Sequence, residues 1–292
     1  MNFNFQTIKA GITSLLLLPL WMACNAYAFE PLNTEDAGTV KKNSNQLELY
    51  FDMVHDSTPS TGGSQSIVVP GEEFVGKKGD LKFFPFTYTR GIAENAELSI
   101  GATYYATPRG NFSPISNNTF AIKWRYFGED GVGLNLALKP IIQMPVTGSQ
   151  QAAGFGQAAT NYGINFIGSN YWGEDLQLHM NVMYLCSPYN PNYLNGGSAA
   201  PLREDIWTIS AAPVVKVTER LSLALDVGFQ TNPPSNEQYT VMYGMVAAII
   251  KITNDVDLGL SIQRSGSKMN DVMTGHGPNT TRTYGGLTWR FD

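Results

Sequence analysis

The feature that most constrains the fold is an alternation of apolar and polar side chains that recurs along most of the chain. Within residues 217–231, Leu223, Leu225 and Val227 fall on one face, and serine, aspartate and glutamine side chains fall on the other. A period of two residues is typical of a β-strand. The pattern predicts about twelve strands, each close to the length that crosses a bilayer at a tilt: 45–55, 80–90, 97–106, 118–127, 132–143, 159–168, 175–186, 205–217, 221–230, 238–252, 256–265 and 281–291.

The connections separate a soluble sandwich from a membrane barrel, which one strand alone cannot do. Short polar turns such as "GEDG", "TER" and "TND" alternate with long segments rich in Gly, Asn, Pro and Ser. Outer-membrane barrels have this alternation, because their periplasmic turns are short and their extracellular loops long. A closed barrel also pairs every backbone polar group within the protein. We therefore predict an all-β fold, an antiparallel transmembrane β-barrel formed by residues 45–292, with both termini on the periplasmic side.

The start of the chain predicts export. Lys9 precedes the apolar run 12–21, and Ala26 and Ala28 form an A-x-A cleavage signal, so residues 1–28 read as a signal peptide. A lipoprotein signal ending at Cys24 is the weaker alternative, because Trp21 stands where leucine is expected. The predicted location is the outer membrane of a Gram-negative bacterium.

Residues 29–44, between the cleavage signal and the first strand, allow two interpretations. At ~3.3 Å per residue the segment is long enough to cross a barrel mouth and act as a plug. It also reads as a disordered periplasmic segment. The sequence leaves both open.

Composition excludes several classes of function. The formal net charge is −5, or −6 once Lys9 is removed with the signal, and the absence of a basic block argues against nucleic acid as a partner. Without Cys24, Cys186 is a lone thiol, so no intrachain disulfide is expected. With three histidines and one cysteine, we predict no metal site and no cofactor.

The last strand carries an assembly signal. In "TYGGLTWRFD", Leu287, Trp289 and Phe291 share one face, which looks like the signal that outer-membrane barrels present to the barrel-assembly machinery, although Asp292 follows the final aromatic residue. Outer-membrane lipid and that machinery are thus predicted partners. Aromatic residues near predicted strand ends suggest a girdle at the membrane interfaces: Trp124, Tyr126, Phe127, Tyr171, Trp172, Trp207 and Trp289.

The beginning of the mature chain carries a family resemblance. "FEPLNTEDAGTVKKNSNQLELYF", together with turn-strand units such as "TERLSLAL" and "ENAELSIGA", resembles the outer-membrane transporter family named for the MetA pathway of phenol degradation. The resemblance spans most of the mature chain through short motifs. It implies an outer-membrane barrel that passes hydrophobic or aromatic compounds.

The inward face supplies the candidate site. A barrel of eight strands is filled by side chains and one of 16–18 leaves a water channel, so twelve strands predict a narrow, partly occluded pore for small solutes. The alternative is a structural barrel whose interior charges satisfy one another. Charges of both signs argue against strong single-ion selectivity. The predicted lumen residues are Glu48, Asp52, Lys123, Arg125, Lys139, His179, Lys216, Asp226, Arg282 and Arg290.

Two other functions are alternatives to a channel. The long loop 56–79 could bind a partner at the cell surface. His55 close to Ser57, or His276, could serve a lipid-modifying enzyme, since an activated hydroxyl needs an adjacent base. These residues do not match the signature of the outer-membrane phospholipases, so we predict no catalytic residues and no enzyme.

Overall fold

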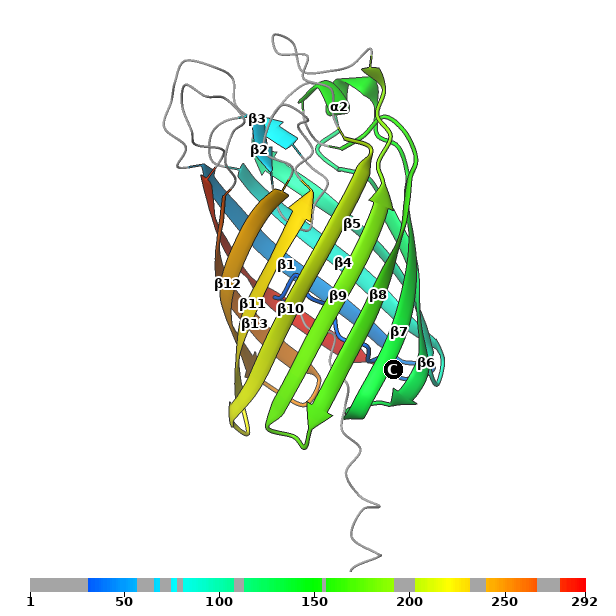
Figure 1. Cartoon of the computed structure of the whole chain (residues 1–292), viewed down its shortest axis with the longest axis vertical. Helices are drawn as coiled ribbons and strands as arrows, with labels where there is room; N and C mark the ends of the chain where they lie inside the picture. The colour runs from blue at the N-terminus through cyan, green and yellow to red at the C-terminus, as the bar shows by residue number, and fades with distance from the viewer. Residues whose placement is uncertain are drawn as a thin grey trace, which may run out of the picture.

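The structure is a computed structural model, and it forms a closed barrel of antiparallel strands (Figure 1). It describes residues 31–56, 66–68, 75–77, 81–107, 113–153, 156–191, 203–231, 240–266 and 279–292. The predicted cleavage residues Ala26 and Ala28 lie outside these ranges, as do Ser57 and His276.

Twelve strands form the barrel, and each pairs with its neighbours in the chain. The two strands at the ends of the chain, β1 and β14, pair with each other from Asn45↔Phe291 to Asp56↔Thr280 and close the sheet. The strands are β1 (Asn45–Asp56), β4 (Leu81–Ala93), β5 (Ala96–Thr107), β6 (Thr119–Glu129), β7 (Val132–Gln143), β8 (Asn161–Trp172), β9 (Leu176–Cys186), β10 (Asp205–Thr218), β11 (Leu221–Thr231), β12 (Thr240–Lys251), β13 (Val256–Gly266) and β14 (Asn279–Phe291).

The outer face of the barrel is apolar. Large hydrophobic side chains on every barrel strand are exposed, and an apolar belt around a closed barrel is the surface that meets lipid. The predicted assembly residues Leu287 and Trp289 belong to this belt. Exposed members, one from each strand, are Leu49, Phe86, Ile100, Ile122, Leu134, Phe166, Met180, Val215, Leu225, Val246, Ile262 and Leu287.

Most strand boundaries agree with the alternation in the sequence, and β8 is the main exception. It runs to Trp172, four residues beyond the predicted end at 168, because the polar "SNYW" stretch pairs with β7 and β9 instead of turning. One assignment to the aromatic girdle was therefore wrong. Tyr171 is buried on the inner face, whereas Trp172 is exposed on the outer face.

Smaller elements lie at the end of the barrel with the long connections. The two-stranded sheet of β2 (Ser66–Val68) and β3 (Val75–Lys77) falls in the predicted loop 56–79. The helix α2 (Gly148–Ala153) falls in the connection between β7 and β8. Both lie at the upper end in Figure 1. Among the residues that the structure describes, no helix has the length and apolar character needed to cross a membrane.

The β5–β6 seam is shorter than the others. Only Ala96–Gly101 pairs with Thr119–Trp124. Beyond it, residues 113–116 continue along β5 through hydrogen bonds from the Tyr105 amide to the Pro114 carbonyl (2.8 Å) and from the Ser116 amide to the Thr103 carbonyl (2.9 Å). Gln150 of α2 donates to the carbonyls of Ser113 and Ile115. The helix thus supports the segment that completes the barrel wall.

Candidate functional site

The ten predicted lumen residues lie on the inner face of the barrel. Seven are buried, namely Glu48, Asp52, Lys123, Arg125, His179, Asp226 and Arg282. Lys139, Lys216 and Arg290 are partly exposed. Whether they line a conducting path stays a prediction, but their partners show how the interior is organised.

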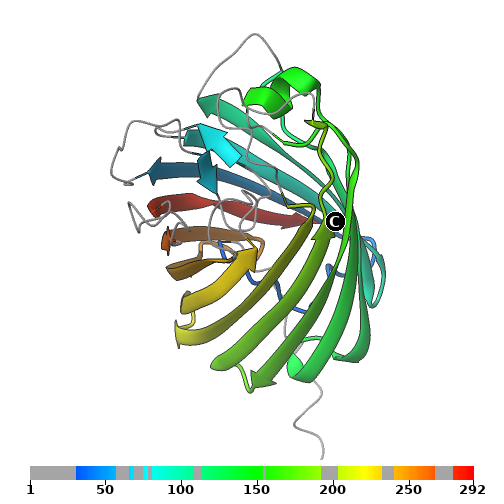
Figure 2. The same cartoon turned by 45° about the horizontal axis from the view of Figure 1, so that its top comes forward.

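Residues 31–44, here called the inner segment, run inside the barrel before entering β1. Figure 2 shows this blue segment within the ring of strands. Its hydrogen bonds reach inward-facing side chains of β13, β11, β8 and β5, and the backbone of β4. Asn43, with φ of 68°, lies where the segment turns into β1.

Asp226 of β11 forms the first anchor of the inner segment. Its carboxylate accepts hydrogen bonds from the backbone amides of Asn33 (2.7 Å) and Thr34 (2.9 Å), and from the Thr34 hydroxyl (2.8 Å). The Tyr243 hydroxyl donates a fourth bond at 3.1 Å. Backbone amides and hydroxyls therefore satisfy a buried carboxylate that lacks a cationic partner in these contacts, and hydrogen bonds to a charged acceptor are among the stronger kind.

The second anchor lies on the opposite side of the lumen from the β1–β14 seam. The Glu35 amide donates to Asn181 Oδ1, and Asn181 Nδ2 donates back to the Glu35 carbonyl, both at 2.8 Å. The Ala37 amide donates to Ser169 Oγ at 2.8 Å. Ser169 Oγ in turn lies 2.8 Å from Nδ1 of His179, so the buried histidine supports this contact.

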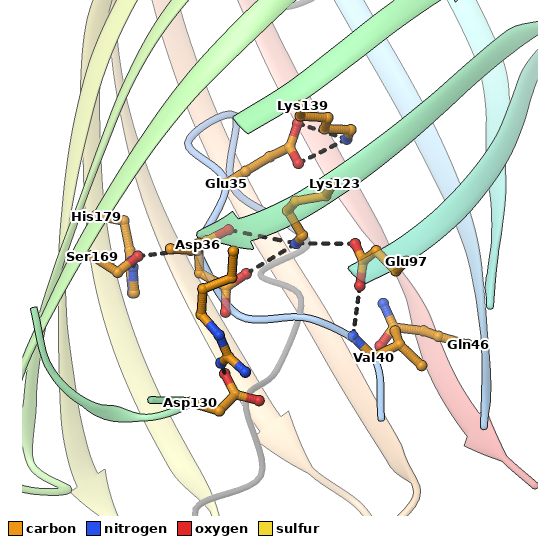
Figure 3. A network of polar contacts seen from close by, with 12 residues as sticks. Glu35, Asp36, Val40, Gln46, Glu97, Lys123, Asp130, Lys139, Ser169 and His179 are labelled. Atoms are coloured by element: carbon orange, nitrogen blue, oxygen red, sulfur yellow. Dashed lines mark hydrogen bonds and ion pairs between the residues drawn. The ribbon is translucent and has the colours of Figure 1, made fainter. Parts of the chain in front are cut away.

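The third anchor is a group of ion pairs shared with β5, β6 and β7 (Figure 3). Lys139 Nζ lies 2.8 and 2.7 Å from the two carboxylate oxygens of Glu35. Lys123 Nζ lies 3.1 Å from Glu97 and 3.6 Å from Asp36. Glu97 also accepts a 2.6 Å hydrogen bond from the Val40 amide. Two adjacent acids of the inner segment thus meet two lysines of the barrel wall.

Gly91 of β4 allows the closest approach between the inner segment and the wall. A side chain there would force Cβ against the carbonyl oxygens of Val40 and Lys41. The Asn43 amide donates to the Gly91 carbonyl at 2.9 Å. Only glycine leaves room for the two backbones to meet.

Burial makes Asp36 the acid of the inner segment most sensitive to pH. The pKa of its carboxyl is raised to about 7, chiefly because burial removes its hydration; Lys123 opposes the rise, and the nearby acids Asp130, Glu97 and Glu35 add to it. Glu35 behaves differently. Burial raises its pKa, but Lys139 and Lys123 outweigh burial and hold the pKa below its usual value.

Attachment of the inner segment should weaken as pH rises from 5 to 8. Because docking raises the pKa of Asp36, the docked state holds a proton that the free segment has lost, and this contribution disappears as pH rises through about 7. Glu35 does not compensate, since its lowered pKa leaves it ionised across the whole window. Single-channel recordings between pH 5 and 8 should show more frequent open events at the higher pH. Asp36→Asn should flatten this dependence, and a slope that survives the substitution would contradict the assignment.

Several other interior charges are paired within the wall or its turns, and Glu48 accepts a hydrogen bond from Gln46. Arg282 of β14 forms a buried pair with Asp52 of β1, with Nε 2.6 Å from Oδ2. Near the short turns, Arg290 pairs with Asp257, Arg125 with Asp130, and Lys216 with Glu174. Such pairs are costly to break singly, since the partner is left as an uncompensated charge.

A cavity of about 310 Å³ remains in the lumen beside the inner segment. Its polar lining includes Lys139, Lys123 and Arg282, and the segment contributes Leu32, Glu35 and Asp36. Its apolar lining includes Tyr105, Ile141, Met183, Leu185 and Met245. A small cavity with an apolar wall and a few convergent polar groups has the character of a ligand pocket.

Sequence reasoning missed the segment's contribution to the site. In the sequence, Thr34, Glu35 and Asp36 stand out only as part of the run that carries the family resemblance, yet they make the central contacts of the lumen. Their partners lie about a hundred residues or more along the chain, as the 192 positions between Thr34 and Asp226 show. No local pattern signals such pairing. The sequence feature that could have revealed this pairing is two adjacent acids in a segment long enough to reach the lysines of the wall.

The other candidate residues are not brought together in the described structure. His55 is exposed, and its supposed partner Ser57 lies outside the described ranges. Cys186 is a free thiol. Within the ranges described, no group of three or more His, Cys, Asp or Glu side chains has the arrangement of a metal site.

The fold, a closed antiparallel barrel of twelve strands, is similar to that of solved outer-membrane channels and porins. An outer membrane channel from Pseudomonas putida F1 has a TM-score of 0.57 at 13% identity, covering 88% of this chain and 98% of that one. A NanC porin has a TM-score of 0.54 at 10% identity, covering 82% of this chain and 98% of that one. A KdgM porin in complex with disordered oligogalacturonate has a TM-score of 0.51 at 8% identity, covering 85% of this chain and 99% of that one.

At these identities the likeness is one of fold. No protein-family model matches the sequence, and no curated protein matches it either. The architecture is therefore shared with channels and porins, and the chemistry of the lumen belongs to this chain's own residues.

Proposed function

We propose that the protein is an outer-membrane channel that passes small solutes through the barrel, with the inner segment constricting the path. The observation that carries this proposal is a closed barrel with an apolar outer belt and a polar interior, in which a cavity remains beside the segment. The apolar outer belt and the polar lumen are the two surfaces expected of a protein that lies in a membrane and provides a path across it.

The route to the membrane follows from the two ends of the sequence. Residues 1–28 act as a cleaved signal peptide, leaving Phe29 as the first residue of the mature protein. Leu287, Trp289 and Phe291 present the last strand to the barrel-assembly machinery. Leu287 and Trp289 are exposed on the outer face, which is consistent with this role.

The solute class is the finer part of the proposal. Resemblance to the MetA-pathway family favours membership in that family and hydrophobic or aromatic solutes. The apolar residues of the cavity, among them Ile141 and Leu185, are compatible with such solutes. Interior charges of both signs favour weak ion selectivity.

The test is single-channel conductance of refolded residues 29–292 in a planar bilayer, with small discrete steps as the expected result. Lys139→Glu should shift the selectivity toward cations, because Lys139 lines the cavity. Lys123 is a poorer choice, since a glutamate there would join Asp36 and Glu97 in a buried cluster of acids. Arg220→Glu, in an exposed turn, is the matched charge reversal and should leave the selectivity unchanged. Equal selectivity in all three proteins would place the ion path elsewhere.

A structural or surface-binding barrel is the second candidate. The observation in its favour is the paired interior, where the inner segment and the buried ion pairs fill much of the lumen. A barrel that inserts but stays silent, both intact and without residues 29–44, would support this candidate. Deletion of 56–79 would then test whether that loop binds a partner.

A further inference from the structure

Two lysines stand side by side on the inner face of the barrel wall. Trp124 of β6 pairs with Leu138 of β7, which brings their inward-facing neighbours Lys123 and Lys139 next to each other. Like charges on neighbouring strands repel and need anionic partners. Of the three carboxylates that pair with them, Glu97 belongs to the wall, whereas Glu35 and Asp36 belong to the inner segment.

The inner segment therefore occupies what the barrel wall alone would present as an anion site. Both oxygens of Glu35 lie within 2.8 Å of Lys139 Nζ, a geometry that any carboxylate of similar reach would reproduce. Lys123 and Lys139 together hold the pKa of Glu35 below its usual value, against the effect of burial. The wall thus stabilises a carboxylate in the anionic form at this position.

The two ion pairs differ in accessibility. The side chains of Lys123 and Asp36 are 3% and 1% exposed, whereas those of Lys139 and Glu35 are 19% and 33% exposed. Lys139 and Glu35 both line the cavity. A solute in the cavity can therefore compete for Lys139 without first disrupting the buried pair of Lys123.

Part of the wall near Lys139 is apolar. Across β8, Lys139 is aligned with Asn165 and then with Met183 of β9. One row further, Ile141 is aligned with Gly163 and then with Leu185. Because Gly163 has no side chain, Ile141 and Leu185 face the same space, and Met183 borders it. All three line the cavity.

From this arrangement we infer that Lys139 and the adjoining apolar wall form a binding site for a small organic monocarboxylate, and that Glu35 is its built-in competitor. The carboxylate of the ligand takes the place of Glu35 on Lys139, and its apolar body lies against Ile141, Met183 and Leu185. Binding at this site releases one anchor of the inner segment. The inference deepens the proposed channel function and rests on it for its physiological role.

The test is calorimetric titration of benzoate into the refolded protein, residues 29–292, in detergent. Benzamide, which has nearly the same shape but no charge, is the matched ligand control. Glu35→Gln should tighten benzoate binding about tenfold, because the competitor loses its charge. Lys139→Gln should weaken it about ten- to a hundredfold, through loss of a charge-assisted contact. Benzamide should bind weakly and equally to all three proteins.

Two further variants control for changes in folding. Glu174→Gln removes an acid that pairs with Lys216 near the short turns, and it should bind benzoate like the parent protein. The double variant Glu35→Gln, Lys139→Gln leaves neither charge unpaired and should bind as weakly as Lys139→Gln alone.

Tighter benzoate binding by Glu35→Gln together with weaker benzoate binding by Lys139→Gln supports the inference. It is overturned if Glu35→Gln binds no more tightly than the parent, or if benzamide follows benzoate through the series. Binding is measured without reference to conduction, so the two proposals fail separately. A protein that conducts but shows no shift with Glu35→Gln refutes the site, whereas one that binds benzoate but stays silent without residues 29–44 refutes the channel.

Discussion

Deletion of residues 29–44 should raise the single-channel conductance several-fold. The inner segment crosses the lumen and is bonded to strands on all sides, so its removal leaves a wider polar path. The β1 strand begins at Asn45 and its pairing with β14 is left in place. The measurement is the step size in planar bilayers, compared with that of intact residues 29–292. An unchanged step size would mean that the segment does not limit the path.

A reversible lock provides the complementary control. Thr34 Oγ1 lies 2.8 Å from Ser210 Oγ of β10, so the pair Thr34→Cys and Ser210→Cys places two sulfur atoms within bonding reach. The free thiol Cys186 is replaced by serine in the same background. Oxidation should hold the conductance at its low level at every pH, and reduction should restore the parent's behaviour. Conductance that rises equally in the oxidised protein would rule out movement of the segment at Thr34.

Substitution of Asp226 by alanine should release the start of the inner segment without shortening the chain. Three of the four hydrogen bonds to this carboxylate come from Asn33 and Thr34. Hydrogen bonds to charged groups contribute about 1.5–3 kcal/mol each and do not add fully, so a loss of at least about 3 kcal/mol is expected. That loss lowers the ratio of docked to free segment by a factor of about 100 or more.

Thiol labelling measures this release. Leu32, next to Asn33, is buried, so a cysteine at this position, in a background without Cys186, reacts rapidly with a maleimide only when the start of the segment leaves the wall. At one fixed pH, Asp226→Ala should label much faster than the parent and should conduct more. Asp257→Ala is the matched control, since that interior aspartate pairs with Arg290 near the short turns. Equal labelling in the Asp226 and Asp257 variants would show that Asp226 does not hold the segment.

The barrel could be predicted because its information is local. Each strand repeats the same alternation of apolar and polar side chains. In a closed sheet that faces lipid, every strand must place its apolar side chains on the outer face and its polar side chains on the inner face. The predicted end of β8 was wrong because polar residues continue the strand there. Residues 169–172 look like a turn because they are polar, but in β8 Ser169 and Tyr171 face a polar lumen. In β4 and β12 the alternation is weaker, because Phe83 and Met245 are apolar yet face inward.

The candidate site could be predicted only in part, because its contacts are not local. The lysines and aspartates of the wall follow from the strand phase, which assigns Lys123, Lys139 and Asp226 to the inner face. The acids that meet them lie outside any periodic pattern. The length of residues 29–44 allowed a plug, but the positions of Glu35 and Asp36 depend on where the chain enters the lumen and on the close passage at Gly91. Those are properties of the assembled barrel.

The inner segment also has a consequence for how the barrel folds. Neighbouring strands form hairpins with little loss of chain entropy, but β1 and β14 join residues at opposite ends of the chain, so this closure is the costly step. The segment precedes β1 directly and bonds to Asn181 of β9 and Ser169 of β8, the wall opposite the closure. It cannot be threaded easily into a finished cylinder. When the segment is bound to the open sheet, it holds β1 near β8 and β9, in the middle of the chain. The distance that β14 must then cover to pair with β1 is correspondingly small.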